Sequence, residues 1–219
     1  MAGRFGIIGC GYVGSAVSLH FRRQGHEVVG TTTSPARSAE LCDVVDHPRI
    51  YRAEDPIADA SFLDHLDGVL IAMAPTTASF EEDQYKKVYG QAVPALVKAL
   101  RERQGRRPLH VSYLSSAGVY GDQSGAICNE QTPPDCSSST NALLASGESA
   151  VLSLNDASTQ ACVLRLGGIY GPGKDIPSYI RSAAGQSVRK NGNHINAWVH
   201  LQDIIRGVDF AFGKRLQGI

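Results

Sequence analysis

Short apolar runs alternate with helical patterns along most of the chain. The pattern predicts a strand from Arg4 to Gly9, a helix from Ser15 to Gln24, and a second strand from Glu27 to Thr32. One face of that helix carries a stripe with spacings of three and four residues: Val13, Ala16, Val17, His20 and Phe21. Gly25 is well placed to end the helix. This alternation is typical of a parallel sheet covered by helices.

Later segments continue the same alternation. The run from Gly68 to Pro75 lacks polar residues, as expected of a central parallel strand buried on both faces, and we expect Pro75 to end it. In the long helix that follows, Pro94 should distort the helix or divide it into two shorter ones. Further elements are predicted as a strand from Leu109 to Ser116, a helix from Leu143 to Leu154, a strand from Ala161 to Leu166, and a last helix with its apolar stripe from Leu201 to Phe212.

The length of 219 residues and the hydrophobic content of 42% suit one large domain. We therefore predict an α/β fold, a doubly wound parallel sheet of the Rossmann type, in a single domain spanning residues 1–219. Residues 121–139 are rich in Gly, Pro, Ser, Asp and Asn, which predicts a long irregular loop. Loops of this length in compact domains often act as lids, so a lid is one possible role here.

Charge and cysteine content narrow the class of partner. The 21 basic residues balance the 21 acidic ones, so no overall field attracts nucleic acid or a membrane surface, and a small molecule is the expected ligand. The five cysteines are scattered, without the Cys and His spacing of metal sites, so we predict reduced thiols and no metal. With no apolar run of membrane-spanning length and no signal peptide, we expect a cytoplasmic protein.

A glycine motif follows the first predicted strand and opens the first helix. Gly9-Cys-Gly-Tyr-Val-Gly14 matches GxGxxG, which is a weak signal alone but a stronger one inside a strand, helix, strand unit. Gly9 can make the tight turn, Gly11 can let a pyrophosphate approach the backbone, and Gly14 can allow close helix packing. An anion would bind at the N-terminus of the helix, and Tyr12 and Val13 of the motif are further candidate cofactor contacts. The alternative is a structural turn without a ligand.

The end of the second strand bears on the choice between NAD and NADP. A carboxylate there usually binds the ribose 2′-hydroxyl, but the stretch from Gly30 to Arg37 contains none. Thr32 offers a hydroxyl, and Arg37 offers a guanidinium that can bind phosphate oxygens. This favours NADP, with NAD as the alternative. Arg37 can equally be a solvated helix residue.

Five segments together resemble one family along nearly the whole chain. They are the glycine loop, Ala72-Met-Ala-Pro75, Leu114-Ser-Ser-Ala-Gly-Val-Tyr-Gly-Asp122, Arg165-Leu-Gly-Gly-Ile-Tyr-Gly-Pro-Gly173, and Asn196-Ala-Trp-Val-His-Leu-Gln-Asp203. These segments resemble the extended and atypical short-chain dehydrogenase/reductase family, including its NAD-dependent epimerase/dehydratase group. The combination is far more specific than the glycine motif alone.

The resemblance implies roles for further residues. It places Ser116 where the family's serine or threonine hydrogen-bonds the substrate oxygen, although a plain turn residue is the alternative. It implies cofactor contacts at these positions: Ala72, Met73, Ala74, Pro75, Ser115, Gly167, Gly168 and Ile169. Asn196 and His200 are candidates for substrate contact. His200 and Asp203 can equally form a hydrogen-bonded helix cap.

The family's acid/base pair, a tyrosine followed four residues later by a lysine, is missing. Alignment on Glu148 places Thr140 at the tyrosine position and Leu144 at the lysine position. A phenol becomes a useful base at neutral pH only when a nearby cation lowers its pKa, and a threonine hydroxyl cannot replace it. Tyr120 is a second catalytic candidate, with Lys174 or His200 as a proton partner. Its alternative role is packing.

Two kinds of function follow. One is an NADP-preferring oxidoreductase or epimerase-like enzyme acting on a carbonyl or sugar-type substrate. The other is a non-catalytic NAD(P)-binding sensor or assembly factor. The family continues with a substrate-binding part beyond the position of Ile219, so we expect a minimal C-terminal substrate part, with a pocket that is small, open or completed by a partner subunit in a homodimer.

Overall fold

Six parallel strands form the central sheet of this computed structural model, which describes residues 2–75, 82–104, 107–187 and 196–219. Their order across the sheet is β3-β2-β1-β4-β5-β6. The strands are β1 (Arg4–Ile8), β2 (Glu27–Thr32), β3 (His47–Ile50), β4 (Gly68–Ile71), β5 (Leu109–Ser116) and β6 (Thr159–Leu166). The chain runs outward from β1 to β3, returns to β4, and then runs outward the other way. This strand order is that of the Rossmann fold, so the predicted fold class is confirmed.

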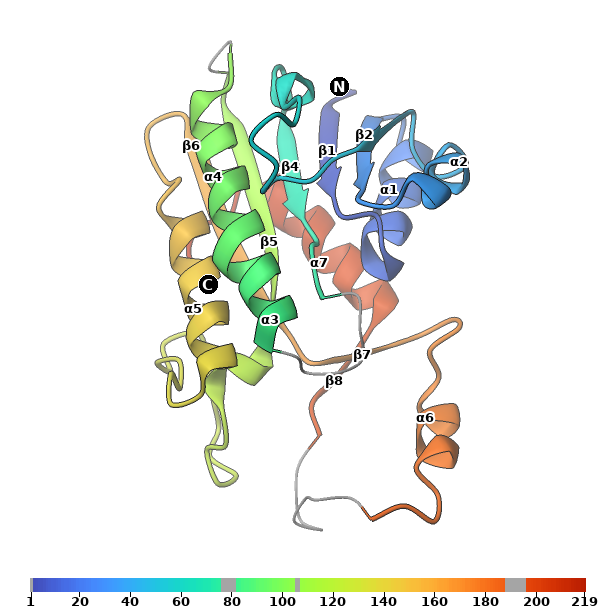
Figure 1. Ribbon diagram of the computed structural model, residues 1–219, viewed down its shortest axis with the longest axis vertical. Coiled ribbons are helices and arrows are strands. Elements are labelled where there is room, and N and C mark those ends of the chain that lie inside the picture. Colours follow the sequence, from blue (N-terminus) through green and yellow to red (C-terminus); the bar gives the residue numbers. More distant parts are fainter. Residues whose placement is uncertain (1, 76–81, 105–106, 188–195) are drawn as a thin grey trace.

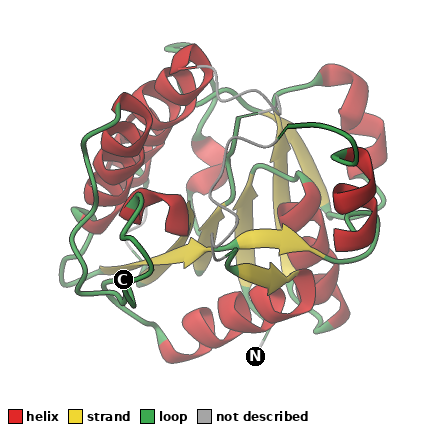
Figure 2. Ribbon diagram, turned by 90° about the horizontal axis from the view of Figure 1, so that it is seen from below, coloured by secondary structure: helices red, strands yellow, loops and turns green. Residues whose placement is uncertain are grey.

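Helices cover both faces of the sheet (Figures 1 and 2). On one face, α1 (Tyr12–Arg23) and α7 (Leu201–Lys214) pack with the sheet around a core that includes Ile7, Val17, Phe21, Leu70 and Val208. On the other face, α4 (Val93–Glu102) and α5 (Ser139–Leu152) pack around a second core that includes Ile71, Leu96, Val111, Tyr113 and Val151. The sheet is therefore doubly wound.

Most predicted elements are present, with small shifts at their ends. The bounds of β2 and β5 are as predicted, and α1 ends before Gly25, which has φ +85°. The long helix is distorted, which is one of the two outcomes that Pro94 predicts: α3 (Glu82–Tyr85), the π-helical segment Lys86–Ala92 and α4 follow one another without a gap, and Pro94 lies in the first turn of α4. Proline lacks an N–H and disturbs the hydrogen bonds of a helix that continues through it.

Two boundaries differ from the prediction for local reasons. Strand β4 ends at Ile71 instead of continuing to Pro75, because Ile71 pairs with Ile8 and the neighbouring strand then turns away at Gly9. Helix α5 begins at Ser139, four residues earlier than predicted, because the Ser138 hydroxyl accepts a hydrogen bond from the Asn141 amide.

Four short elements were not predicted from the sequence. They are β3, the two-stranded pair of β7 (Gly168–Tyr170) and β8 (Trp198–His200), and α6 (Ile176–Ser182), to which the one-turn α2 (Ser38–Leu41) can be added. Helix α6 has no buried residue and extends away from the sheet at the lower right of Figure 1. An amphipathic pattern needs a buried face, and α6 has none to leave a signal in the sequence.

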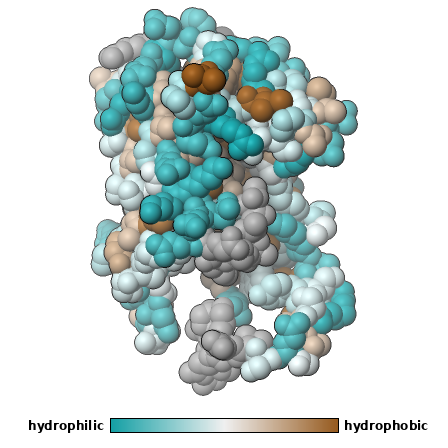
Figure 3. All heavy atoms as spheres, in the orientation of Figure 1, coloured by the Kyte–Doolittle hydropathy of each residue, from teal (hydrophilic) through white to brown (hydrophobic). Residues whose placement is uncertain are grey.

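One face of the molecule shows how polar and apolar residues are distributed on its surface. The face drawn in Figure 3 is mostly hydrophilic, with apolar residues in separate spots. Within the described ranges, no helix combines the length and the apolar character that crossing a bilayer requires.

Candidate functional site

The carboxyl ends of the strands bring the predicted site residues to one edge of the sheet. Gly9 follows β1, Thr32 ends β2, Ala72 follows β4, Ser116 ends β5 and Gly167 follows β6. The strand order reverses between β1 and β4, and ligands of open α/β sheets bind at such a point. The sequence therefore assembles its candidate residues where this fold places ligands.

Two of the three glycines of the loop have a steric reason, and the third borders open space. Gly9 has φ +100°, and a Cβ there would lie 2.9 Å from the Ala72 carbonyl oxygen. A Cβ on Gly14 would collide with the Gly9 carbonyl oxygen. By contrast, a Cβ on Gly11 would meet no described atom within 4 Å apart from those of Gly11 and its two chain neighbours. Gly9 and Gly14 are thus required by packing, whereas Gly11 borders open space that a ligand can approach.

Backbone hydrogen bonds hold the loop against β2. The Gly9 amide donates to the Thr31 hydroxyl at 2.9 Å, and the Cys10 amide donates to the Thr31 carbonyl at 2.8 Å. Helix α1 then begins at Tyr12 after Gly11, which supplies no side-chain cap, and the first turn has no acidic residue. The first amides of α1 and the positive end of its dipole therefore remain suited to an anion.

Arg37 reaches this loop from the end of β2. Its Nη2 donates to the Cys10 carbonyl at 3.1 Å, and its Nε lies 3.8 Å from a carboxylate oxygen of Glu40. A cavity of about 160 Å³ lies beside it, lined by Cys10, Ser15, Thr32, Arg37, Glu40, Leu41 and Val44. Burial raises the pKa of the Cys10 thiol to about 11, so this cysteine lines the cavity as a neutral group.

Ser115 and Ser116 end β5 but face different surroundings. The buried Ser115 hydroxyl donates to Glu148 at 2.6 Å, so its side chain belongs to an internal network. The half-buried Ser116 hydroxyl accepts from the Gly118 amide at 3.1 Å, which is the turn role weighed above. Since a hydroxyl that accepts one bond still has a proton to donate, this arrangement leaves Ser116 able to contact a substrate oxygen.

Tyr120 has partners that favour packing. Its hydroxyl donates to the Asn129 carbonyl at 2.8 Å, and the Arg165 guanidinium lies 4.8 Å from its ring centroid. Arg165 Nη2 in turn pairs with Glu148 at 2.7 Å, with both side chains almost fully buried. Hydrogen bonds to Glu148 raise the pKa of Arg165, so this cation is permanent. Asn129 lies in the predicted irregular loop of residues 121–139, so its hydrogen bond with Tyr120 ties that loop to the network.

The positions of the missing acid/base pair offer no substitute base. Thr140 Oγ1 lies 3.2 Å from Ser138 Oγ in the first turn of α5, and Leu144 is buried in the core. Nearby, burial raises the pKa of both Tyr89 and Tyr113, which keeps their phenols protonated at neutral pH.

The predicted site residues of the last third of the chain lie in and around β7, β8 and the start of α7. A Cβ on Gly167 would lie 2.7 Å from the Ala197 carbonyl oxygen, and one on Gly168 would meet the Trp198 ring, so the close approach of β7 and β8 requires both glycines. Ile169 packs against the core beneath α1 and α7. Asn196 is exposed just before β8, and His200 caps α7 because its Nδ1 accepts from the Gln202 amide at 3.1 Å. The cap role of His200 is thus confirmed.

Three residues after β4 complete the predicted cofactor set. Met73 packs partly against the core, while Ala74 and Pro75 continue the chain along the carboxyl edge. A larger hollow of about 440 Å³ lies at the open side of β6, and Tyr120 is the sole predicted site residue among those described that line it. We therefore place the candidate site at the glycine loop and not at this hollow.

Sequence reasoning did not pair Glu148 with Arg165, nor Tyr12 with the segment after β7. The first pair could have been found from the sequence, because a charged residue in an apolar strand and a charged residue of opposite sign in a covering helix are expected to form a buried ion pair. The second contact has no such signal, because it joins residues far apart in the chain: the Tyr12 hydroxyl donates to the Pro172 carbonyl at 2.8 Å.

Fold and site together define a Rossmann-type α/β protein with a dinucleotide-type glycine loop. The model of the NAD dependent epimerase/dehydratase family matches residues 7–218. The chain belongs to this family. No curated protein matches it.

Solved structures share the fold at low identity. A putative NAD-dependent epimerase/dehydratase from Methylobacillus flagellatus is 24% identical, with a TM-score of 0.72, over 98% of this chain and 71% of that one. A conserved protein of unknown function from Silicibacter pomeroyi is 22% identical, with a TM-score of 0.69, over 97% and 69%. MoeE5 in complex with UDP-glucuronic acid and NAD is 21% identical, with a TM-score of 0.79, over 99% and 74%.

Proposed function

We propose that this chain binds NADP in preference to NAD at the glycine loop. We propose further that it acts as an oxidoreductase or epimerase-like enzyme on a carbonyl or sugar-type substrate. The observation that carries the proposal is the loop itself, where Gly9 and Gly14 are sterically required and Gly11 borders open space at an uncapped helix N-terminus. Structures of similar fold hold NAD together with UDP-sugars.

The preference for NADP rests on Arg37 and Thr32 beside the 160 Å³ cavity. An Arg37 guanidinium that already donates to the Cys10 carbonyl lies within reach of a group bound on the loop, and Glu40 is its only competing carboxylate within the described residues. A guanidinium binds a phosphate through two parallel hydrogen bonds, which the 2′-hydroxyl of NAD cannot match.

The chemistry follows from the edge of the sheet. Bound NADP would supply a hydride acceptor or donor at its nicotinamide. Ser116, at the end of β5, would hold the reacting oxygen, while the backbone of Gly167, Gly168 and Ile169 would border the nicotinamide. The acid/base group has no assignment, because neither Thr140 nor Leu144 can move the proton.

Titration with NADPH and NADH tests the binding proposal, with nicotinamide fluorescence and melting temperature as readouts. We expect tighter binding of NADPH, and we expect Arg37→Leu to bring the two affinities within about twofold of each other by removing the phosphate contact. Arg23→Leu, a change of equal charge at the far end of α1, serves as the control. Tighter binding of NADH by the unaltered protein would contradict the NADP preference.

A non-catalytic NAD(P)-binding role is the second candidate, and the burial of Leu144 at the lysine position favours it. Two readouts separate the two candidates: nicotinamide absorbance over a panel of carbonyl compounds, which reports net oxidation or reduction, and chromatography of UDP-sugar products, because an epimerase returns its hydride and leaves the absorbance unchanged. Turnover that Ser116→Ala abolishes would support the enzyme. Cofactor binding without turnover would support the non-catalytic role.

A further inference from the structure

A short strap, defined here as residues 170–174, crosses the N-terminus of α1. It is a closed turn, because the Gly171 amide donates to the Lys174 carbonyl at 3.0 Å and the Lys174 amide donates to the Gly171 carbonyl at 2.9 Å. The turn begins at the end of β7 and leads into α6. Its backbone is therefore held in one shape, which fixes where the Lys174 side chain leaves the main chain while the side chain itself stays free to change its rotamer.

The strap lies directly against Tyr12, the first residue of α1. The Tyr12 hydroxyl donates to the Pro172 carbonyl at 2.8 Å, and a Cβ on Gly171 would lie 3.0 Å from the same hydroxyl. The Lys174 ammonium lies 4.7 Å from the centroid of the Tyr12 ring. Lys174, far from the glycine loop in the sequence, thus places a positive charge against the first residue of α1.

An anion bound at the start of α1 would give this ammonium a partner. The N-terminus of a helix carries partial positive charge, which favours an anion at the same place. Among the described residues, no ion pair includes Lys174, and the first turn of α1 has no acidic side chain. The neighbouring Asp175 is used elsewhere, since it caps α6 and lies 3.8 Å from Arg181. Within the described part of the chain, the contact of this ammonium is with the Tyr12 ring, and it is weak and exposed.

We propose that Lys174 is a binding residue for the diphosphate of a dinucleotide, and that it moves from the Tyr12 ring to this diphosphate when the glycine loop is occupied. This inference rests on the proposed function. The loop amides and the lysine approach from two segments, so the diphosphate is held between α1 and the strap. The same contact would fix the strap over the ligand through Tyr12 and Pro172.

Affinities for ADP-ribose, NADP and adenosine, measured by calorimetry, test the proposal. ADP-ribose carries the diphosphate without the nicotinamide, and adenosine carries no phosphate. We expect Lys174→Met to weaken ADP-ribose and NADP binding about tenfold and to leave adenosine binding unchanged. Lys174→Arg should stay within about twofold of the unaltered protein. The affinity of Lys174→Met should also fall less steeply as salt increases.

Lys98→Met provides the matched control, because Lys98 is an exposed lysine on α4 and the substitution changes the net charge equally. Both variants should melt at the temperature of the unaltered protein, since both side chains are exposed. Equal affinities of Lys174→Met and Lys98→Met would overturn this inference and leave dinucleotide binding intact. Failure of the unaltered protein to bind ADP-ribose or NADP would overturn the proposed function and this inference together.

Discussion

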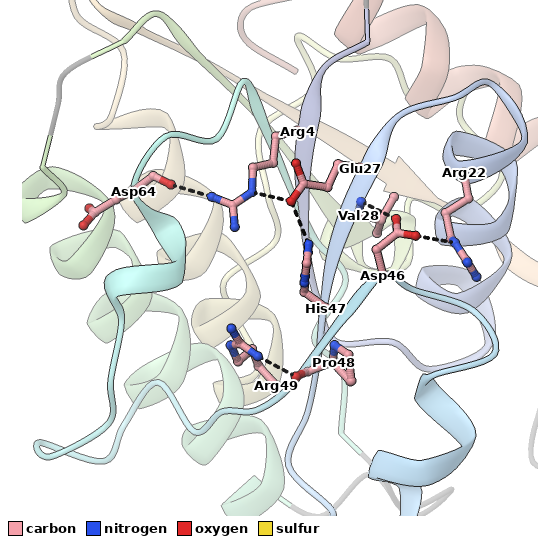
Figure 4. A network of polar contacts seen from close by, with 9 residues as sticks. All are labelled: Arg4, Arg22, Glu27, Val28, Asp46, His47, Pro48, Arg49 and Asp64. Carbon is pink, nitrogen blue, oxygen red and sulfur yellow. Dashed lines mark hydrogen bonds and ion pairs between the residues drawn. The ribbon is translucent and has the colours of Figure 1, made fainter.

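The two ends of the parallel sheet treat their polar groups differently. At the amino ends, charged side chains pair with one another: Glu27 accepts from Arg4 at 3.1 Å and lies 2.7 Å from His47, each being the first residue of its strand (Figure 4). Asp46 likewise lies between Arg22, at 3.1 Å, and the Val28 amide. We call this the closed end of the sheet, because its charged side chains form ion pairs and hydrogen bonds with one another.

At the carboxyl ends, charges and amides face outward instead. The first turn of α1 has no side-chain cap, Arg37 reaches only a backbone carbonyl and a distant Glu40, and Lys174 rests on a ring. Beneath this open edge, however, Glu148 and Arg165 form a buried pair. The difference indicates that the polar groups at the amino ends of the strands maintain the fold, while those at the carboxyl ends are available to a ligand. The buried pair of Glu148 and Arg165 is the rigid support beneath the carboxyl ends.

The largest effect on stability is expected from a substitution in the buried pair of Glu148 and Arg165. Glu148→Gln should lower the free energy of unfolding by about 3–5 kcal/mol, because Arg165 is left as an uncompensated buried charge. Urea unfolding measures the change. Glu102→Gln, at an exposed glutamate on α4, should cost less than about 1 kcal/mol. A double change of Glu148→Gln and Arg165→Met should cost less than the sum of its parts, and strict additivity would show that the two side chains do not interact.

The next effect compares one substitution at two helical glycines. Gly14→Ala should abolish dinucleotide binding and cost about 1–3 kcal/mol of stability, because its methyl group meets the Gly9 carbonyl and the loop must shift. Gly213→Ala, in α7 where the methyl group would meet no described atom within 4 Å beyond its chain neighbours and its own helix backbone, should instead stabilise the protein by up to about 1 kcal/mol and leave binding unchanged. Calorimetry and thermal melting check both. Normal dinucleotide binding by Gly14→Ala would separate the loop from the ligand site.

The sequence predicts those features of the two ends of the sheet that depend on residues close together in the chain, but not those that depend on contacts between distant segments. The glycine loop, β2 and β5 follow from local pattern, because periodicity and turn chemistry act over a few residues, whereas the role of Ser116 came from the resemblance. The resemblance supplied the rest of the predicted edge. The positions of Lys174 over Tyr12 and of Arg165 under Tyr120 could not be predicted, since each depends on contacts between segments far apart in the chain. Strand β3 was missed because its residues are polar and include Pro48.

A pH effect belongs to the closed end, near the start of β5. His110 is buried, its Nε2 lies 2.9 Å from the Leu216 carbonyl, and its Nδ1 has no partner among the described residues. Burial lowers its pKa below 6.5. Well above pH 6.5 the ring is neutral in both the folded and the unfolded protein. As the pH falls below 6.5, the unfolded chain binds a proton that the folded protein excludes, so stability decreases by up to about 1.4 kcal/mol per pH unit.

Urea unfolding of the unaltered protein and of His110→Gln, at several values between pH 7.5 and 5.5, measures this effect. The variant should lose less stability over the range, because glutamine does not titrate. Parallel pH profiles of the two proteins would show that His110 is not the group responsible. Dinucleotide affinity of the folded protein should not depend on this substitution, since His110 lies at the opposite end of β5 from Ser116.

The smallest effect concerns the paired charges in Figure 4. Glu27→Gln removes the carboxylate that Arg4 and His47 share, but the Glu27 side chain is 46% exposed, so water screens both contacts. We expect a loss of less than about 1 kcal/mol in low salt, and less in 1 M salt, where screening is stronger. Affinity for dinucleotide should be unchanged. Weaker dinucleotide binding at equal stability would mean that charge at the closed end acts on the ligand through the sheet, and that the two ends do not serve separate purposes.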